Sequence, residues 1–240
     1  LKLETEAAHS IAIKKKNIKL QTALNEFIKK TYKGEYYNVL YAKYFKNKRS
    51  VKRLAEGRIV DTLEGHISPY DVLIKKYSNR YGYDWRLITA QMYQESGFDP
   101  KAKSPAGAIG LMQLMPRTAL SIGVNNMKDP ASSIKGGVKY LSWLRDRFDS
   151  ELPIGERLWF SLAAYNAGLG HVQDARRLTK ELGLDNKKWF GNTENAMLLL
   201  SKREYSSQAR YGYVNGREPV KYVREIKERF EAYIDMSGSF

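Results

Sequence analysis

The 240-residue sequence contains no cysteine. A disulfide framework, a thiol nucleophile and a thiolate metal site are therefore excluded. The sequence also lacks any run approaching the roughly 18–20 consecutive apolar residues of a transmembrane helix, so we expect no segment of it to cross a membrane. Residues 1–6 mix both charges and lack the apolar core of a signal peptide. We accordingly expect the chain to be a processed or excised piece of a longer protein.

Histidine is scarce, which limits the metal sites that this sequence can form. The three histidines, His9, His66 and His171, are far apart and show no ligand-like spacing. The glycines Gly107 and Gly110 are not followed by the Gly-Lys-Ser/Thr of a phosphate-binding loop. We therefore predict no metal site and no cofactor.

Acidic residues are outnumbered, with 26 Asp and Glu against 41 Lys and Arg, a net charge of +15. Residues 1–53 hold 14 basic and 4 acidic residues (+10), and residues 54–240 hold 27 and 22 (+5). A basic surface suits nucleic acid, anionic lipid or an acidic polysaccharide, and an ordinary solvated face explains it equally well. Because no nucleic-acid-binding motif accompanies the lysine-rich segments 14–16 and 46–53, we predict no nucleic-acid partner.

The proportions of hydrophobic residues (42%) and charged residues (28%) are typical of a globular protein with a core. In a basic, aromatic-rich zone at residues 1–50 we predict a short strand at 9–14 and a helix at 20–30. A connector follows at 51–67. In the remaining zone, 68–240, alternating strand patterns are scarce, so we predict that it is almost entirely α-helical.

Capping residues predict where the helices of this last zone begin. The segment 68–71 (Ser-Pro-Tyr-Asp) places a cap, a first-turn proline and an acid in order. Asp84 is expected to cap a helix that begins at residue 85, and Asp129 with Pro130 is expected to open a helix at 131–148. Further helices are predicted from Pro116, at 156–167 and at 220–234.

Glu95 is the candidate catalytic residue of this sequence. The helix from residue 85 is expected to end at Ser96-Gly97, so Glu95 lies at a helix C-terminus, where the macrodipole disfavours a carboxylate. Partial burial among the neighbouring aromatic and methionine side chains would raise its pKa as well. A raised pKa keeps a carboxyl protonated near neutral pH, as a general acid requires. A lone glutamate at a helix end is otherwise usually an exposed surface residue.

Two later sequence blocks also carry candidate site residues. Residues 103–116 (Lys-Ser-Pro-Ala-Gly-Ala-Ile-Gly-Leu-Met-Gln-Leu-Met-Pro) combine glycines with a serine and a glutamine, and residues 162–168 (Leu-Ala-Ala-Tyr-Asn-Ala-Gly) bring a hydroxyl and an amide to a helix end. Each block alone is compatible with an ordinary loop or a tight helix crossing. In this order and spacing after Glu95-Ser96, they resemble the catalytic domain of soluble lytic murein transglycosylases, a family similar in fold to goose-type lysozyme. The resemblance covers about residues 68–236.

The resemblance implies cleavage of the β-1,4 bond between N-acetylmuramic acid and N-acetylglucosamine in peptidoglycan. The muramic 6-hydroxyl attacks its own anomeric carbon and gives a 1,6-anhydro end, so one carboxyl suffices where most glycosidases use two. Glu95 would protonate the leaving oxygen and then deprotonate the 6-hydroxyl, and the nearby acid Asp99 has no role. The substrate-binding residues that the resemblance implies are Ser104, Gln113, Met115, Tyr165, Asn166, Tyr222, Ser96 and Phe98. Of these, Ser104 and Gln113 would contact the sugar N-acetyl and hydroxyl groups, Tyr165 would hydrogen-bond near Glu95, and Ser96 would position Glu95.

Later segments resemble the membrane-bound lytic murein transglycosylase F branch, chiefly 174–179, 198–201, 205–206, 211–216 and 222–223. Members of that branch carry an N-terminal periplasmic binding-protein-like sensor domain, and residues 10–46 are similar to its tail. We therefore predict a mainly α, lysozyme-like catalytic domain at 68–240 with a short α/β remnant of the sensor domain at 1–50. The resemblance also implies a bacterial periplasmic location, outer-membrane association through an anchor missing here, and a small ligand or muropeptide for the missing sensor.

Two alternatives stay open from the sequence. A muramidase-type hydrolase would use the same glutamate with water and leave a reducing end, and a non-catalytic peptidoglycan-binding module would leave the glycan intact. The presence of Glu95, Ser104, Gln113 and Tyr165 together favours the transglycosylase.

Overall fold

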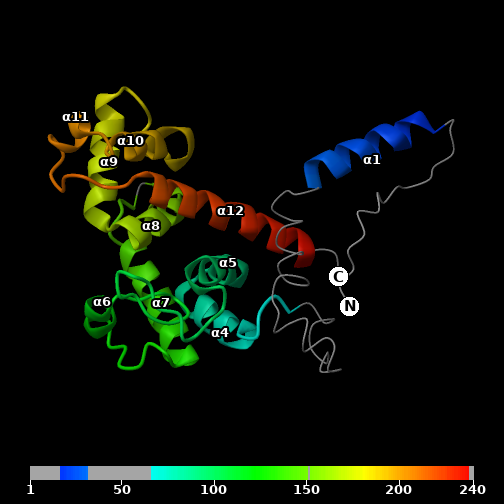
Figure 1. Ribbon diagram of the computed structural model, residues 1–240, viewed down its shortest axis with the longest axis horizontal. Helices are drawn as coiled ribbons and strands as arrows, with labels where there is room; N and C mark the ends of the chain where they lie inside the picture. Colours follow the sequence, from blue (N-terminus) through cyan, green and yellow to red (C-terminus); the bar gives the residue numbers. More distant parts are fainter. Residues whose placement is uncertain (1–16, 32–65, 151, 238–240) are drawn as a thin grey trace. The chain divides into compact units, whose positions relative to one another are not determined.

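The computed structural model describes residues 17–31, 66–150 and 152–237 (Figure 1). The chain divides into two compact units, Leu1–Arg58 and Ile59–Phe240. The first unit contains α1 (Ile18–Thr31), which confirms the helix predicted at 20–30. The strand predicted at 9–14 and most of the connector lie outside the described residues.

The second unit is built from helices, as predicted. These are α4 (Asp71–Tyr81), α5 (Trp85–Ser96), α6 (Pro116–Ser121), α7 (Pro130–Arg145), α8 (Ile154–Ala167), α9 (Leu169–Glu181), the π-helical turn η2 (Trp189–Thr193), α10 (Glu194–Leu199), α11 (Arg203–Ser206) and α12 (Arg217–Ser237). Pairing of β type within residues 66–150 and 152–237 is limited to two isolated bridges, Lys103 with Ile109 and Ile109 with Leu114. None of the helices in these ranges combines the length and the apolar content that a bilayer crossing requires.

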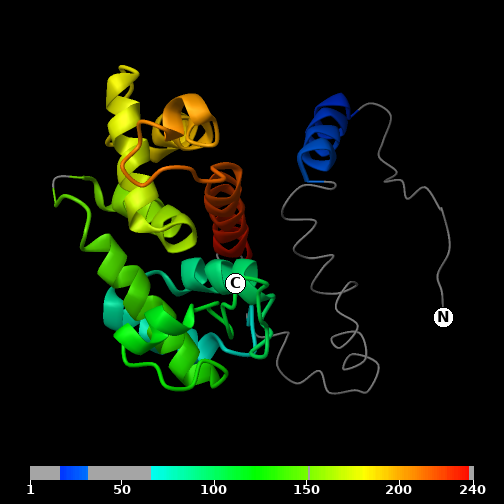
Figure 2. The ribbon, with the colours of Figure 1, turned by 60° about the vertical axis from the view of Figure 1, so that its left-hand side comes forward.

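Helices α5 and α8 lie at the centre of the packing. Helix α12 packs on both of them, α7 packs on α8 and α4, and α9 packs on α8 and α10, an arrangement that Figures 1 and 2 show from two sides. Five consecutive residues of α8, from Phe160 to Ala164, are buried. Three of them are Ser or Ala, and such small side chains let helices approach on every side of α8.

Two of the predicted caps are confirmed. The carboxylate of Asp84 accepts a hydrogen bond from the backbone N–H of Arg86 at 2.9 Å at the start of α5. Asp129 accepts one from the N–H of Ser132 at 2.8 Å, and Pro130 occupies the first turn of α7. Each carboxylate satisfies a backbone donor that the first helical turn leaves unpaired.

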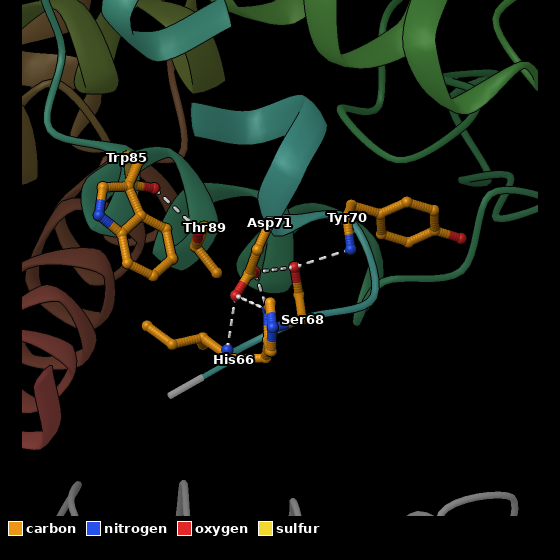
Figure 3. A network of polar contacts seen from close by, with 7 residues as sticks. His66, Ser68, Tyr70, Asp71, Trp85 and Thr89 are labelled. Carbon is orange, nitrogen blue, oxygen red and sulfur yellow. Dashed lines mark hydrogen bonds and ion pairs between the residues drawn. The ribbon is translucent and has the colours of Figure 1, made fainter. Parts of the chain in front are cut away.

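The start of α4 differs from the prediction, because the helix begins at Asp71 rather than directly after Ser68. Figure 3 shows the reason: Asp71 is the centre of a turn and not only a first-turn acid. Its buried carboxylate accepts hydrogen bonds from Ile67 N (2.7 Å), Ser68 N (2.8 Å) and Ser68 Oγ (2.6 Å), and it lies 3.5 Å from His66 Nδ1. Ser68 Oγ in turn accepts from Tyr70 N at 3.2 Å.

A glycine of α7 sets how closely the segment 103–116 approaches that helix. A Cβ atom placed on Gly137 would lie 2.5 Å from Met112 Cβ and 2.6 Å from its Cγ. Met112 is itself fully buried. Only glycine therefore lets the Met112 side chain rest directly on the α7 backbone.

Candidate active site

Glu95 occupies the last turn of α5, as predicted. The helix ends through Gly97, which adopts a positive φ of 57° and donates its N–H to Tyr93 O at 2.8 Å. This left-handed conformation suits glycine and ends the helix at Ser96, one residue after Glu95. The carboxyl is half-buried against α12, whose packing on α5 supplies its partner.

That partner is Tyr222 of α12. Its hydroxyl donates to Glu95 Oε1 at 2.5 Å, and its side chain is 5% exposed. The same hydroxyl oxygen accepts a bond from Gln91 Nε2 at 3.2 Å. Gln91 precedes Glu95 by one helical turn on the same face of α5. The three side chains therefore form a continuous hydrogen-bonded chain.

Burial raises the pKa of Glu95 to about 8, and the hydrogen bond from Tyr222 opposes this by favouring the carboxylate. The direction of the predicted shift is thus confirmed, with burial as its main cause. The pKa values of Tyr222 and Tyr165 are both raised, first by burial and then by the charge of Glu95. Both tyrosines therefore remain neutral hydroxyls at physiological pH.

Ser96, which the resemblance implied would position Glu95, connects α5 to the segment that follows it. Its Oγ lies 2.9 Å from Leu111 O and 3.2 Å from Met92 O, within hydrogen-bond distance of both. The hydroxyl thereby holds the end of α5 against the 103–116 segment, directly beside the carboxyl.

Ser104 and Gln113, which were expected to contact sugar groups, both bind within their own loop. Ser104 Oγ accepts from Ala108 N at 3.0 Å, and Ser104 N donates to Ala108 O at 3.0 Å. Gln113 has a φ of 45°, and its Nε2 donates to Gly110 O (2.9 Å) and Ala102 O (3.2 Å). These bonds hold the loop together internally, and the Gln113 amide nitrogen donates to backbone carbonyls of that loop.

Tyr165, which was expected to hydrogen-bond near Glu95, donates its hydroxyl to Met112 O at 2.7 Å. It is close enough to Glu95 for the two to interact electrostatically, and its ring lies 5.2 Å from that of Tyr140. Asn166 follows it on α8 and is exposed. Tyr165 thus contacts the protein interior, whereas Asn166 faces the solvent.

The other two predicted residues lie at the edges of this region. Phe98 has a φ of 68° and packs edge-on against Tyr93, with ring centroids 5.4 Å apart. Met115 is 43% exposed at the start of α6. Within the described residues, Glu95 is not hydrogen-bonded to any of four predicted site residues: Ser104, Met115, Phe98 and Asn166.

The sequence interpretation missed Gln91, Tyr140 and the Met112 carbonyl. Gln91 gave one signal, since it is an amide one turn before Glu95 on an otherwise apolar helix face. Tyr140 and the backbone carbonyl gave none, because their contacts with Tyr165 depend on how α7 and the 103–116 segment pack on α8.

Among the described residues, the acid nearest to Glu95 in the sequence, Asp99, makes no contact with it. Asp99 lies beyond the end of α5, is exposed, and accepts a bond from Lys101 N at 2.9 Å. No other carboxylate among the described residues perturbs the pKa of Glu95. Over the same residues, no group of three or more His, Asp or Glu side chains is arranged to hold a metal ion.

Comparison with known proteins gives consistent matches. Residues 72–188 match the family model of the transglycosylase SLT domain. The chain is 38% identical over 195 residues to membrane-bound lytic murein transglycosylase F of Shewanella pealeana, covering 81% of this chain and 40% of the relative. It is 43% identical over 179 residues to the protein of that name in Vibrio vulnificus, covering 75% and 33%. The chain thus spans about two fifths or less of the length of these curated relatives.

Solved structures agree with the sequence matches. The 70 kDa soluble lytic transglycosylase of Escherichia coli superimposes with a TM-score of 0.51 and 26% identity, covering 91% of this chain and 33% of that one. A complex of the 70-kDa soluble lytic transglycosylase with bulgecin A gives a TM-score of 0.51 and 27% identity, covering 83% and 30%. The predicted lysozyme-like helical fold is therefore confirmed for the second unit.

Proposed function

This chain belongs to the transglycosylase SLT family, and from that premise we propose that it is a peptidoglycan lytic transglycosylase with Glu95 as its single general acid and base. The observation that carries the proposal is the state of this carboxyl. It is buried enough to have a pKa of about 8, and it accepts a hydrogen bond from a neutral tyrosine. A carboxyl of this kind is protonated at neutral pH and can donate that proton to a leaving oxygen.

The proposed reaction uses the Glu95 carboxyl twice, first as an acid and then as a base. Protonated Glu95 gives its proton to the glycosidic oxygen between N-acetylmuramic acid and N-acetylglucosamine as the bond from that oxygen to the muramic C1 breaks. The muramic 6-hydroxyl oxygen then bonds to C1, and the Glu95 carboxylate takes the hydroxyl proton. The products are a 1,6-anhydro-muramic end and a free N-acetylglucosamine hydroxyl, and no water is consumed. Tyr222 stabilises the carboxylate between the two transfers.

A single carboxyl is consistent with an internal nucleophile. A glycosidase that activates water or forms a covalent intermediate needs a second acid about 5–10 Å from the first. Asp99, the nearest acid in sequence, is exposed and bound to the backbone of Lys101. The site chemistry therefore favours the substrate's own 6-hydroxyl over water as the nucleophile.

The remaining residues are proposed as substrate contacts. Ser104 and Gln113 would present their loop to the sugar N-acetyl and hydroxyl groups, with the Gln113 carbonyl oxygen as the available acceptor, since its Nε2 binds within the loop. Exposed Met115 would form part of the cleft wall, and Phe98 its edge. Tyr165 would support the region beside Glu95 by holding Met112 O, and exposed Asn166 would meet the substrate.

We extend the proposal to the whole chain. Residues 68–240 would form the catalytic domain, 51–67 a connector and 1–50 the tail of a periplasmic binding-protein-like sensor domain that takes a small ligand or muropeptide. The relatives are named as membrane-bound, which supports association with the cell envelope, in the periplasm and at the outer membrane. The net charge of +15 suits a polymer whose stem peptides carry carboxylates.

The test is mass spectrometry of the products released from purified peptidoglycan. The chain is expected to release anhydro-muropeptides, Glu95→Gln is expected to release none, and Asp99→Asn, which removes the nearest other acid, is expected to match the parent. Circular dichroism of each variant checks that it is folded.

Two other outcomes would replace the proposal. Reducing-end products that depend on Glu95 would make the chain a muramidase-type hydrolase that activates water. Binding of peptidoglycan in a sedimentation assay without any soluble product would make it a non-catalytic binding module.

A further inference from the structure

Gln91 is a buried polar residue to which the proposed reaction gives no role. Its side chain is fully buried on α5, and its Nε2 donates to Tyr222 Oη at 3.2 Å. Its Oε1 is also buried and accepts no hydrogen bond from the residues that the structure describes. Burying an unpaired amide oxygen is unfavourable, and an apolar residue of similar volume would avoid this cost. The one described polar contact that offsets it is the bond to Tyr222.

This bond determines where the hydroxyl hydrogen of Tyr222 points. A phenol carries one hydrogen, and an oxygen that already accepts a bond from Gln91 turns that hydrogen toward its other neighbour. That neighbour is Glu95 Oε1, at 2.5 Å. A donor bonded to the phenol oxygen also polarises the O–H group, so Tyr222 becomes a stronger donor to Glu95.

We propose that Gln91 is a positioning residue that aims the Tyr222 hydroxyl at Glu95 and so stabilises the carboxylate that remains after Glu95 has released its proton. The inference deepens the proposed function and rests on it for the kinetic readout, whereas the titration of Glu95 can be followed without substrate. Gln91 itself contacts neither the substrate nor the transferred proton, and it acts through Tyr222.

The surroundings of Glu95 leave few other groups that could produce the same effect. The titratable side chains that face it are Tyr222 from α12 and Tyr165 from α8, and Tyr140 of α7 contacts the latter. The pKa of each tyrosine is raised, so all three stay neutral where Glu95 titrates. Among the described residues, no charged side chain shifts the pKa of Glu95.

The test is the variant Gln91→Met, which keeps the length of the side chain and removes the donor. Two quantities are measured in the full chain: the pH dependence of kcat/KM for anhydro-muropeptide release, and the carbon-13 NMR titration of the Glu95 carboxyl, assigned with Glu95→Gln. A weaker Tyr222 donor destabilises the carboxylate, so both midpoints are expected to move upward by about half a pH unit. We expect kcat to fall several-fold with KM unchanged.

Gln94→Met is the matched control. It removes an amide from the same helix, one bonded to Glu225 Oε2 at 2.7 Å and to Arg229 Nη1 at 3.0 Å rather than to Tyr222. We expect it to leave the Glu95 midpoint unchanged even if it lowers stability. When Gln91→Met is added to a Tyr222→Phe variant, the Glu95 midpoint is expected to move no further, because the hydroxyl through which Gln91 acts is already absent.

An unchanged midpoint in Gln91→Met, or an equal shift with and without Tyr222, would overturn the proposal. If Gln91→Met does not fold, Gln91→Leu gives the same comparison. If the chain releases no anhydro product, the proposed function fails, and the NMR titration still decides the role of Gln91.

Discussion

The Tyr222 hydroxyl lies 2.5 Å from Glu95 Oε1, although the two residues are 127 positions apart in the sequence. Burial and this hydrogen bond act in opposite directions on the same carboxyl. Burial raises the pKa of Glu95 to about 8 by penalising the charged form, and Tyr222 limits the rise by stabilising it. A group balanced in this way can both release a proton and recover it near neutral pH.

The activity is expected to fall as the pH rises through about 8, because the first step needs protonated Glu95. Below that pH the carboxyl keeps its proton, so the rate at pH 6–7 is expected to lie near its maximum. Initial rates of anhydro-muropeptide release between pH 5 and 10 measure this limb, with circular dichroism to confirm folding at each pH. A limb near pH 5, where an ordinary glutamate titrates, would contradict the assignment.

Tyr222→Phe is expected to lower kcat about 10- to 100-fold, since it removes the donor that stabilises the Glu95 carboxylate. The same loss moves the basic limb above the parent value of about 8. Tyr233→Phe is the control, because Tyr233 is buried on the same helix and contributes nothing to the pKa of Glu95. Equal pH profiles for the two variants would show that the Tyr222 hydroxyl has no part in the chemistry.

Glu95→Gln is expected to stabilise the fold at high pH. The pKa of Glu95 in the folded state, about 8, lies above its ordinary value of 4.5, so the folded state holds the proton more tightly than the unfolded state does. The contribution of this group to stability is therefore fully present below about pH 4.5 and is lost as the pH rises toward 8. Glutamine carries no charge and avoids that loss.

We expect Glu95→Gln to raise the free energy of unfolding by about 2–4 kcal/mol more at pH 9 than at pH 5. This is less than the energy equivalent of the whole pKa shift, because the carboxyl is only half-buried. Urea denaturation at the two pH values measures the difference. Glu181→Gln, at an exposed position on α9, is expected to have the same effect at both. A Glu95→Gln effect that does not depend on pH would contradict the raised pKa.

Gly137→Ala is expected to destabilise the protein by about 1–3 kcal/mol, since the new Cβ would overlap Met112. Displacing Met112 would also disturb the carbonyl that accepts the Tyr165 hydroxyl, so activity should fall with stability. Gly155→Ala is the matched change in α8, where a Cβ meets nothing within 4 Å. It is expected to stabilise by about 0.5–1 kcal/mol through helix propensity. Thermal denaturation of both variants tests the contrast.

Local signals made much of the fold predictable. Asp84 and Asp129 cap the helices that they were predicted to cap, because a carboxylate two or three residues before a free N–H acts within one turn of chain. Glu95 was located at the end of α5 for the same reason, through Ser96 and Gly97. The start of α4 was misplaced because Asp71 bonds backward to Ile67 and Ser68, which changes the turn before the helix begins.

The interactions between site residues were less predictable. The motifs indicated that Tyr165 and Gln113 belong to the site, and the structure binds Tyr165 to a backbone carbonyl and the Gln113 amide to its own loop. Which atom a hydroxyl or amide binds depends on sub-ångström packing between distant segments, and residue spacing does not carry that information. Gln91 gave only a weak signal, an amide one turn before Glu95 on an otherwise apolar helix face, and that signal does not reveal the bond to Tyr222.

The position of Tyr222 on α12 has a consequence for biosynthesis. A ribosome delivers Glu95 long before it delivers Tyr222, and the two meet only when residues 217–237 have been made and have docked on α5 and α8. A nascent or proteolytically shortened chain therefore holds its carboxyl without the tyrosine that completes it. The proposed transglycosylase activity would therefore reach its full rate only after α12 has folded into place.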